Sequence, residues 1–156
     1  MAATGRATPA RCPPPRLERG VGLDERLAEL VPGAPRSGLQ LLVLAHDWAA
    51  TPLGPVGDWS PTLLSTVSTV VNSPFGMLLM WGRDLVMVYN DRYAELLGPR
   101  HPAALGATVP EVWPDVWGDI TGMVDTVFAG GSTYSEDLLL VMTRHGFAEE
   151  LSLIHI

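Results

Sequence analysis

Lysine is missing from this sequence of 156 residues, and all ten of its basic residues are arginine. Six of the arginines fall within residues 1–38, so the remainder carries four arginines against thirteen acidic residues. A body with this negative charge repels phosphate groups, and no basic stripe with interleaved aromatic residues interrupts it. The composition therefore argues against nucleic acid as a partner.

Cysteine is nearly missing as well. Cys12 is the only one, which excludes a disulfide framework and a cysteine-based zinc site and favours a reducing cytoplasm. The N-terminus lacks the apolar run of a signal peptide. The longest uncharged stretch, residues 59–82, is interrupted by Asn72, Ser73 and Pro74, so we expect no transmembrane helix.

What the chain has is enough apolar material for one folded domain, with 47% hydrophobic and 17% charged residues. Residues 1–38 are rich in Pro, Gly, Ala and Arg. We interpret them as a flexible leader, or as translated sequence upstream of the true start, with a short helix over residues 23–31. The predicted domain covers residues 39–150. It opens with an apolar run at 39–45 and a loop at 46–59.

Local signals predict the elements that follow. Ser60 and Pro61 are suited to begin a helix that Pro74 ends, with one apolar stripe along it. Two apolar runs, 77–81 and 85–89, flank Gly82-Arg83-Asp84 and predict a β-hairpin.

The second half of the domain has fewer clear signals for where helices and strands begin and end. Asn90 or Asp91 can cap a short helix that ends at Gly98, and Thr108 and Glu111 have capping-box spacing. A helix is predicted from Pro114 to the stop at Gly130-Gly131; its apolar residues keep an i, i+4 rhythm and are Val116, Ile120, Val124 and Phe128. A strand is predicted at 134–142. A turn at 144–146 then leads into a further strand that begins at Phe147.

This order and several motifs resemble the PAS sensor domains at the N-termini of bacterial sensor histidine kinases. The motifs are HDWAATPLGP (46–55), WGRDLVMVYNDRY (81–93), LGPRHPAALG (97–106), EVWPDVW (111–117) and SEDLLLVMTRHGFAEE (135–150). The resemblance implies an α+β fold, a PAS-like antiparallel sheet with helices packed on one face, whose last strands are missing.

The resemblance also implies a function. Such a domain is a cytoplasmic sensory input module that detects a small molecule or a partner and relays its state to a C-terminal transmitter. The transmitter would be a histidine kinase, and the sequence contains neither its phosphoacceptor helix nor its ATP lid. Two alternatives remain: a ligand-free PAS module for dimerisation and partner docking, or the input domain of a phosphatase or cyclase. We expect a homodimer in the full-length protein.

Residues 151–156 depart from the family, which continues here through further strands. Their codons can be back-translated into a transposase adapter sequence, so we interpret them as an adapter-derived tail. The alternative is an ordinary alternating strand, with Leu151 and Leu153 on one face.

The candidate ligand-binding residues are aromatic and polar side chains between the expected sheet and helices: Trp81, Tyr89, Asn90, Tyr93, Trp113 and Trp117. The alternative is that the aromatics fill the core and Asn90 caps a helix. We expect no catalytic residue, because no titratable groups converge, and no metal site, because the four histidines are dispersed. The cofactor is unknown; the sequence disfavours haem, since no histidine lies between Pro102 and Arg144, and a cysteinyl-flavin adduct, since Cys12 lies in the leader.

Overall fold

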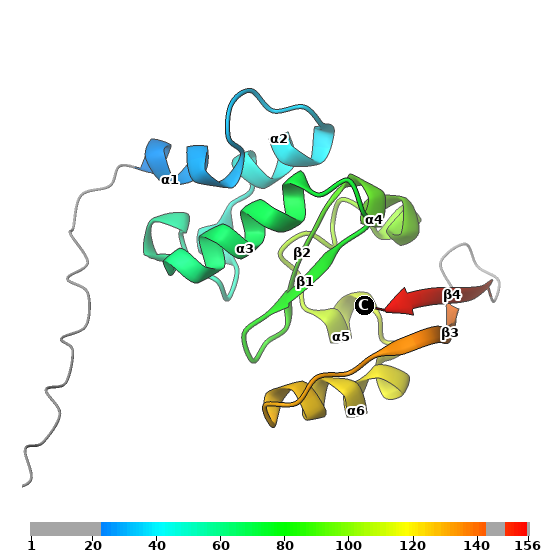
Figure 1. The fold of residues 1–156 in the computed structure, drawn as a ribbon. Coiled ribbons are helices and arrows are strands. Elements are labelled where there is room, and N and C mark those ends of the chain that lie inside the picture. The colour runs from blue at the N-terminus through cyan, green and yellow to red at the C-terminus, as the bar shows by residue number, and fades with distance from the viewer. Residues whose placement is uncertain (1–22, 143–148, 156) are drawn as a thin grey trace, which may run out of the picture.

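The computed structural model describes residues 23–142 and 149–155 (Figure 1). Its helices are α1 (Leu23–Leu30), α2 (Gly38–Ala45), α3 (Pro61–Asn72), α4 (Asp91–Leu97), α5 (Val109–Val112) and α6 (Trp117–Phe128), with short 3-10 turns η1 (Trp48–Ala50), η2 (Val56–Asp58) and η3 (Gly98–Arg100). Its strands are β1 (Leu78–Trp81), β2 (Val86–Tyr89), β3 (Ser135–Met142) and β4 (Glu149–His155). The predicted α+β class is confirmed.

Helix α3 forms where its capping signals predict it. The Ser60 hydroxyl accepts a hydrogen bond from the Leu63 N–H at 3.1 Å, and Pro61 occupies the first turn. The apolar stripe is buried throughout; it comprises Leu63, Leu64, Val67, Val70 and Val71. Figure 1 shows α3 lying along the β1–β2 hairpin, with α1 and α2 packed against α3.

The predicted hairpin is also confirmed. Strands β1 and β2 pair antiparallel from Leu78↔Tyr89 to Trp81↔Val86, and Gly82 turns the chain with a φ of 73°. Strand β2 is the centre of this layer. On its other edge Met87 exchanges hydrogen bonds with the 106–107 backbone, at 2.9 and 3.0 Å. All four of its residues are buried.

The predicted boundary at residue 39 is too late. Helix α1 was expected within a flexible leader, but Leu30 and Val31 are buried in the core. The Asn72 side-chain amide donates to the Leu30 carbonyl at 2.9 Å, and the Arg26 guanidinium donates to the Trp59 carbonyl at 2.7 Å. Residues 26–38 are therefore part of the folded body, because the apolar side of α1 covers α3. Residues 1–22 lie outside the described residues.

The predicted single sheet is not what the structure shows. Strands β3 and β4 form a second, separate antiparallel pair, from Ser135↔His155 to Met142↔Glu149. Within the described ranges no strand joins the two pairs, so the sheet of the expected PAS-like fold is not present as one layer. The predicted turn at 144–146 lies outside those ranges. The backbone of residues 151–155 belongs to β4, as in the alternating-strand interpretation; their adapter origin stays a prediction.

Helix α6 ends at Gly130-Gly131 as predicted, with Ala129 as its C-cap, but it starts later than predicted and its last turn is more exposed. Pro114 begins a turn, and the helix itself starts at Trp117. Val116 and Val124 are buried as expected, but Phe128 is 55% exposed. The last turn of α6 extends past the core. The i, i+4 pattern of apolar residues therefore continues into a turn that has no core side chains to pack against. In the part of the chain that the structure describes, no helix has the length and apolarity needed to cross a membrane.

Candidate functional site

The structure groups Tyr89, Tyr93 and Trp113, with Asn90 bonded to the Tyr93 N–H, and places Trp81 elsewhere. Tyr89 ends β2 and Tyr93 lies one turn into α4, with their ring centroids 6.0 Å apart. Trp113 follows α5, is buried, and is close enough to Tyr93 for its indole N–H to influence that phenol. Trp117 begins α6 and is half-buried, whereas Trp81 ends β1 and lines a different part of the surface.

Burial governs the ionisation of the two tyrosines. It raises the pKa of Tyr89 to about 12, with a smaller contribution from the nearby Tyr93 phenol. Burial likewise raises the pKa of Tyr93 to about 12, while the Trp113 indole acts in the opposite direction. Both phenols are therefore protonated at neutral pH and can donate a hydrogen bond.

Two side chains that the sequence analysis did not select complete this aromatic group. The Tyr89 hydroxyl lies 3.0 Å from Nδ1 of His101, and the two rings meet edge to face. The Arg100 guanidinium lies 4.1 Å over the Trp113 ring and pairs with the Asp115 carboxylate at 3.0 Å. The signal that could have found both is the motif at 97–106, which contains them; the sequence analysis considered the histidines only as metal ligands.

The buried indole N–H of Trp113 is a further feature of this group. It makes no well-formed hydrogen bond within the described residues, yet it lies close enough to the Tyr93 hydroxyl to favour the charged form of that phenol. The Tyr93 hydroxyl is therefore the partner of this N–H, at a distance or angle outside ordinary hydrogen-bond geometry.

Asn90 is positioned by the backbone around it. Its Oδ1 accepts from the N–H groups of Met77 and Tyr93, each at 3.1 Å, and so caps α4. Its amide donates to three carbonyls at the end of α3 and in the following loop: Val70, Ser73 and Phe75. The side chain is 1% exposed and fully engaged. This arrangement matches the capping alternative.

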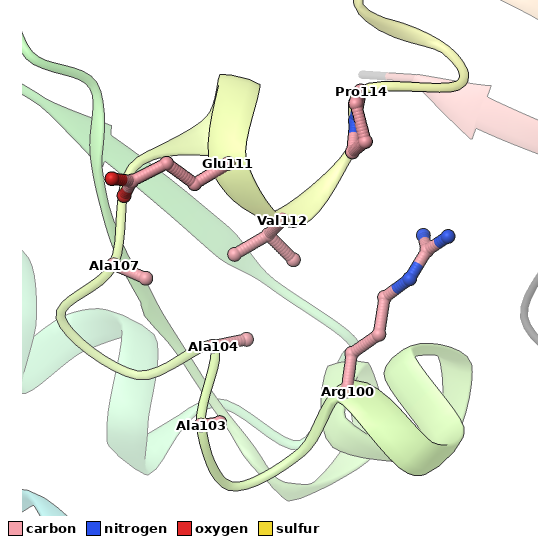
Figure 2. A pocket seen from close by; sticks show the side chains of 7 residues that line it. All are labelled: Arg100, Ala103, Ala104, Ala107, Glu111, Val112 and Pro114. Carbon is pink, nitrogen blue, oxygen red and sulfur yellow. The ribbon is translucent and has the colours of Figure 1, made fainter.

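The larger of two described hollows lies beside this group (Figure 2). It encloses about 410 Å³ and is lined by Arg100, Ala103, Ala104, Ala107, Glu111, Val112 and Pro114. Val112 and the alanine methyl groups form its apolar floor, while Arg100 and Glu111 lie on different sides of it (Figure 2). None of the six predicted residues lines it.

Glu111 is held at the rim by a capping box. Its Oε2 accepts from the Thr108 N–H at 3.0 Å and from the Thr108 hydroxyl at 2.8 Å, as the sequence spacing predicts. These hydrogen bonds, the backbone one first, lower the pKa of the Glu111 carboxyl. The carboxylate is therefore committed to the start of α5.

The smaller hollow is polar and lies between η2 and the hairpin turn. It encloses about 240 Å³; its lining includes Asp58, Trp59, Trp81 and Asp84. Trp81 is thus the one predicted site residue that faces a described hollow.

The described residues contain no group of three His, Cys, Asp or Glu side chains that could hold a metal ion. Comparison with protein-family models, with curated proteins and with solved structures finds no match. The argument for function therefore rests on the geometry of the chain and on the motifs in its sequence.

Proposed function

We propose that this chain is the PAS-like sensory input module of a cytoplasmic bacterial signalling protein, with a histidine kinase as the expected transmitter. The observation that supports the proposal is the order of elements along the chain: the β1–β2 hairpin, short helices, the longer helix α6 and the β3–β4 strand pair. This is the order on which the resemblance was based.

The outer edge of β1 supports the same proposal. The Asn90 N–H bonds the Met77 carbonyl, and by the pairing register the backbone groups of residues 79 and 81 point to β2 as well. Leu78 and Met80 therefore direct their N–H and C=O groups away from β2. Within the described residues no strand pairs with this edge. A further strand of a PAS-like sheet would pair there and end its exposure.

The larger hollow is the proposed position of the sensed molecule. Its apolar floor and its volume of about 410 Å³ are suited to a small ligand with an apolar body. A ligand there would contact Arg100, which pairs with Asp115 just before α6, and would thereby bias the position of α6. A ligand that favours one of two arrangements shifts the population of the transmitter attached to the module.

The test is a thermal-shift screen of small metabolites against three forms of the chain. Ala103→Leu fills the hollow from an exposed alanine at its wall, and Ala50→Leu adds the same side chain to an exposed alanine in η1. We expect a ligand that raises the Tm of wild type and of Ala50→Leu but not that of Ala103→Leu. A ligand that stabilises all three forms equally would place sensing elsewhere.

The ligand-free docking module remains the second candidate, and one observation favours it. Neither described hollow is lined by Tyr93, and the side chains of Tyr89 and Trp113 beside it are themselves buried. Exposed apolar residues on α2 and after α3 would then serve association: Leu41, Leu42 and Phe75. If this candidate holds, the screen finds no ligand, and Leu41→Glu shifts the sedimentation of the chain from dimer to monomer.

A further inference from the structure

Gly106 and His46 make a close contact between segments sixty positions apart in the sequence. Gly106 has a φ of 79°, and a Cβ added to it would lie 2.5 Å from Nε2 of His46. Its N–H donates to the Met87 carbonyl at 3.0 Å, so its segment, residues 105–109, is bound to the edge of β2. The imidazole of His46 therefore occupies the space that a side chain at position 106 would need.

The other side of the contact is fixed in the core. His46 caps the C-terminus of α2, and its ring lies 4.5 Å from the Trp48 ring. The Trp48 indole N–H donates to the Val43 carbonyl at 2.8 Å, and its ring meets the Trp59 ring edge-on at 5.1 Å. The segment 46–59 is thus a rigid base from which the His46 ring reaches the 105–109 segment.

The surroundings of the His46 ring favour its neutral form. Within the described residues neither ring nitrogen has a hydrogen-bond partner, and Nε2 faces the Cα of Gly106, which accepts nothing. The Trp48 ring that packs on the imidazole carries no charge, and neither does the Thr51 methyl group on the other side of the Gly106 position. Asp47 is the one charged neighbour identified, and it favours protonation. Burial outweighs it and lowers the pKa of His46 from 6.5.

We infer that His46 is a pH-sensitive switch: the neutral imidazole holds residues 46–59 against residues 105–109, and its protonation releases the 105–109 segment. The release would reach the larger hollow through Ala107, which lines it, and β2 through Met87, which bonds Ala107. Above pH 6.5 the contact is complete, since neither the closed nor the open form binds the proton. As the pH falls below 6.5, His46 is protonated in the open form before it is protonated in the closed form. The contact weakens over this pH range, and the weakening stops once the closed form is protonated as well.

The test is amide hydrogen exchange of residues 105–109 in the whole chain at pH 7.5 and at pH 5, corrected for the intrinsic exchange rate. We expect protection in this segment to fall severalfold at the lower pH, because the open form binds the proton more tightly than the closed form. His46→Gln, which cannot be protonated in this range, is expected to show equal protection at both. His155→Gln, which removes the histidine in β4, is the matched control and keeps the wild-type response.

Asp47→Asn provides a second test that does not alter the ring. Removing the carboxylate removes the charge that favours protonation, so the loss of protection moves to lower pH. Equal protection of wild type at both pH values would overturn the inference. So would a His46→Gln chain that loses protection as wild type does, or an Asp47→Asn chain whose midpoint is unchanged.

Discussion

The hydroxyl of Tyr89 lies 3.0 Å from Nδ1 of His101 and ties the last residue of β2 to the loop after η3. The hydroxyl is at the end of a side chain with no exposed surface, whereas His101 is half-buried. With the Tyr89 phenol protonated at neutral pH, it can donate to a neutral imidazole. The bond therefore connects the central strand to the segment that carries Arg100.

Tyr89→Phe removes this hydrogen bond and keeps the ring. We expect the free energy of unfolding to fall by about 1 kcal/mol, the usual net value of one hydrogen bond, as measured by urea denaturation. In a cycle with His101→Ala, the double variant is expected to lose about 1 kcal/mol less than the two single losses together. Strict additivity would mean that the hydroxyl contributes nothing through His101.

The side chain of Asn90 makes five hydrogen bonds with the backbone around it. Asn90→Ala is expected to cost about 3 kcal/mol, since α4 loses its cap and three carbonyls lose a donor. Asn90→Ser restores an acceptor for the Tyr93 N–H but not the amide, so it recovers about 1 kcal/mol of that loss. Thermal and urea unfolding measure both. If the serine variant is as stable as wild type, the amide bonds to the three carbonyls contribute nothing, and capping α4 is the whole role of Asn90.

Gly106→Ala tests the contact with His46. Gly54 offers a matched control, because its φ is 68° and nothing lies within 4 Å of an added Cβ. We expect Gly54→Ala to cost about 1 kcal/mol from backbone strain alone, and Gly106→Ala to cost at least about twice that. In a His46→Ala background the cost at position 106 falls toward the control value. An unchanged cost in that background would assign the effect to Thr51 or to the backbone.

The Glu111 capping box predicts a dependence of stability on acid. Because the pKa of Glu111 is lowered in the folded chain, its contribution is complete above 4.5, the value of a free glutamate, and is lost as the pH falls through the folded value. Glu111→Gln keeps an acceptor for Thr108 without a charge. The difference in unfolding free energy between wild type and this variant is expected to shrink as the pH is lowered toward 3. A constant difference would contradict the prediction.

Local signals in the sequence were sufficient for much of the fold. The caps at Ser60 and Thr108 act over three residues, and Gly82 acts within its own turn, so the sequence letters contain the whole interaction. These signals place α3, the first hairpin and α5. Helix α6 begins three residues later than predicted, because Pro114 is equally suited to a turn.

Contacts between distant residues could not be predicted in the same way. Leu30 and Val31 lie in a segment of Pro, Gly and Arg, and only the presence of α3 makes their burial favourable. The pairs Tyr89–His101 and His46–Gly106 join loops whose relative positions are set by the core, not by spacing. Among the predicted aromatic residues, Tyr89 and Trp113 are buried and the other three are half-buried. For Trp81 and Tyr89 the difference depends on which face of the hairpin each one occupies.

The central position of β2 has a consequence for how the sequence can vary. A strand with one face in water accepts polar residues at every second position. Strand β2 has helix α3 against the hairpin and a neighbour on each edge, and none of its four residues is exposed. Divergence in related chains is therefore expected to leave Val86 to Tyr89 as an uninterrupted apolar block, without the alternation by which strands are usually recognised.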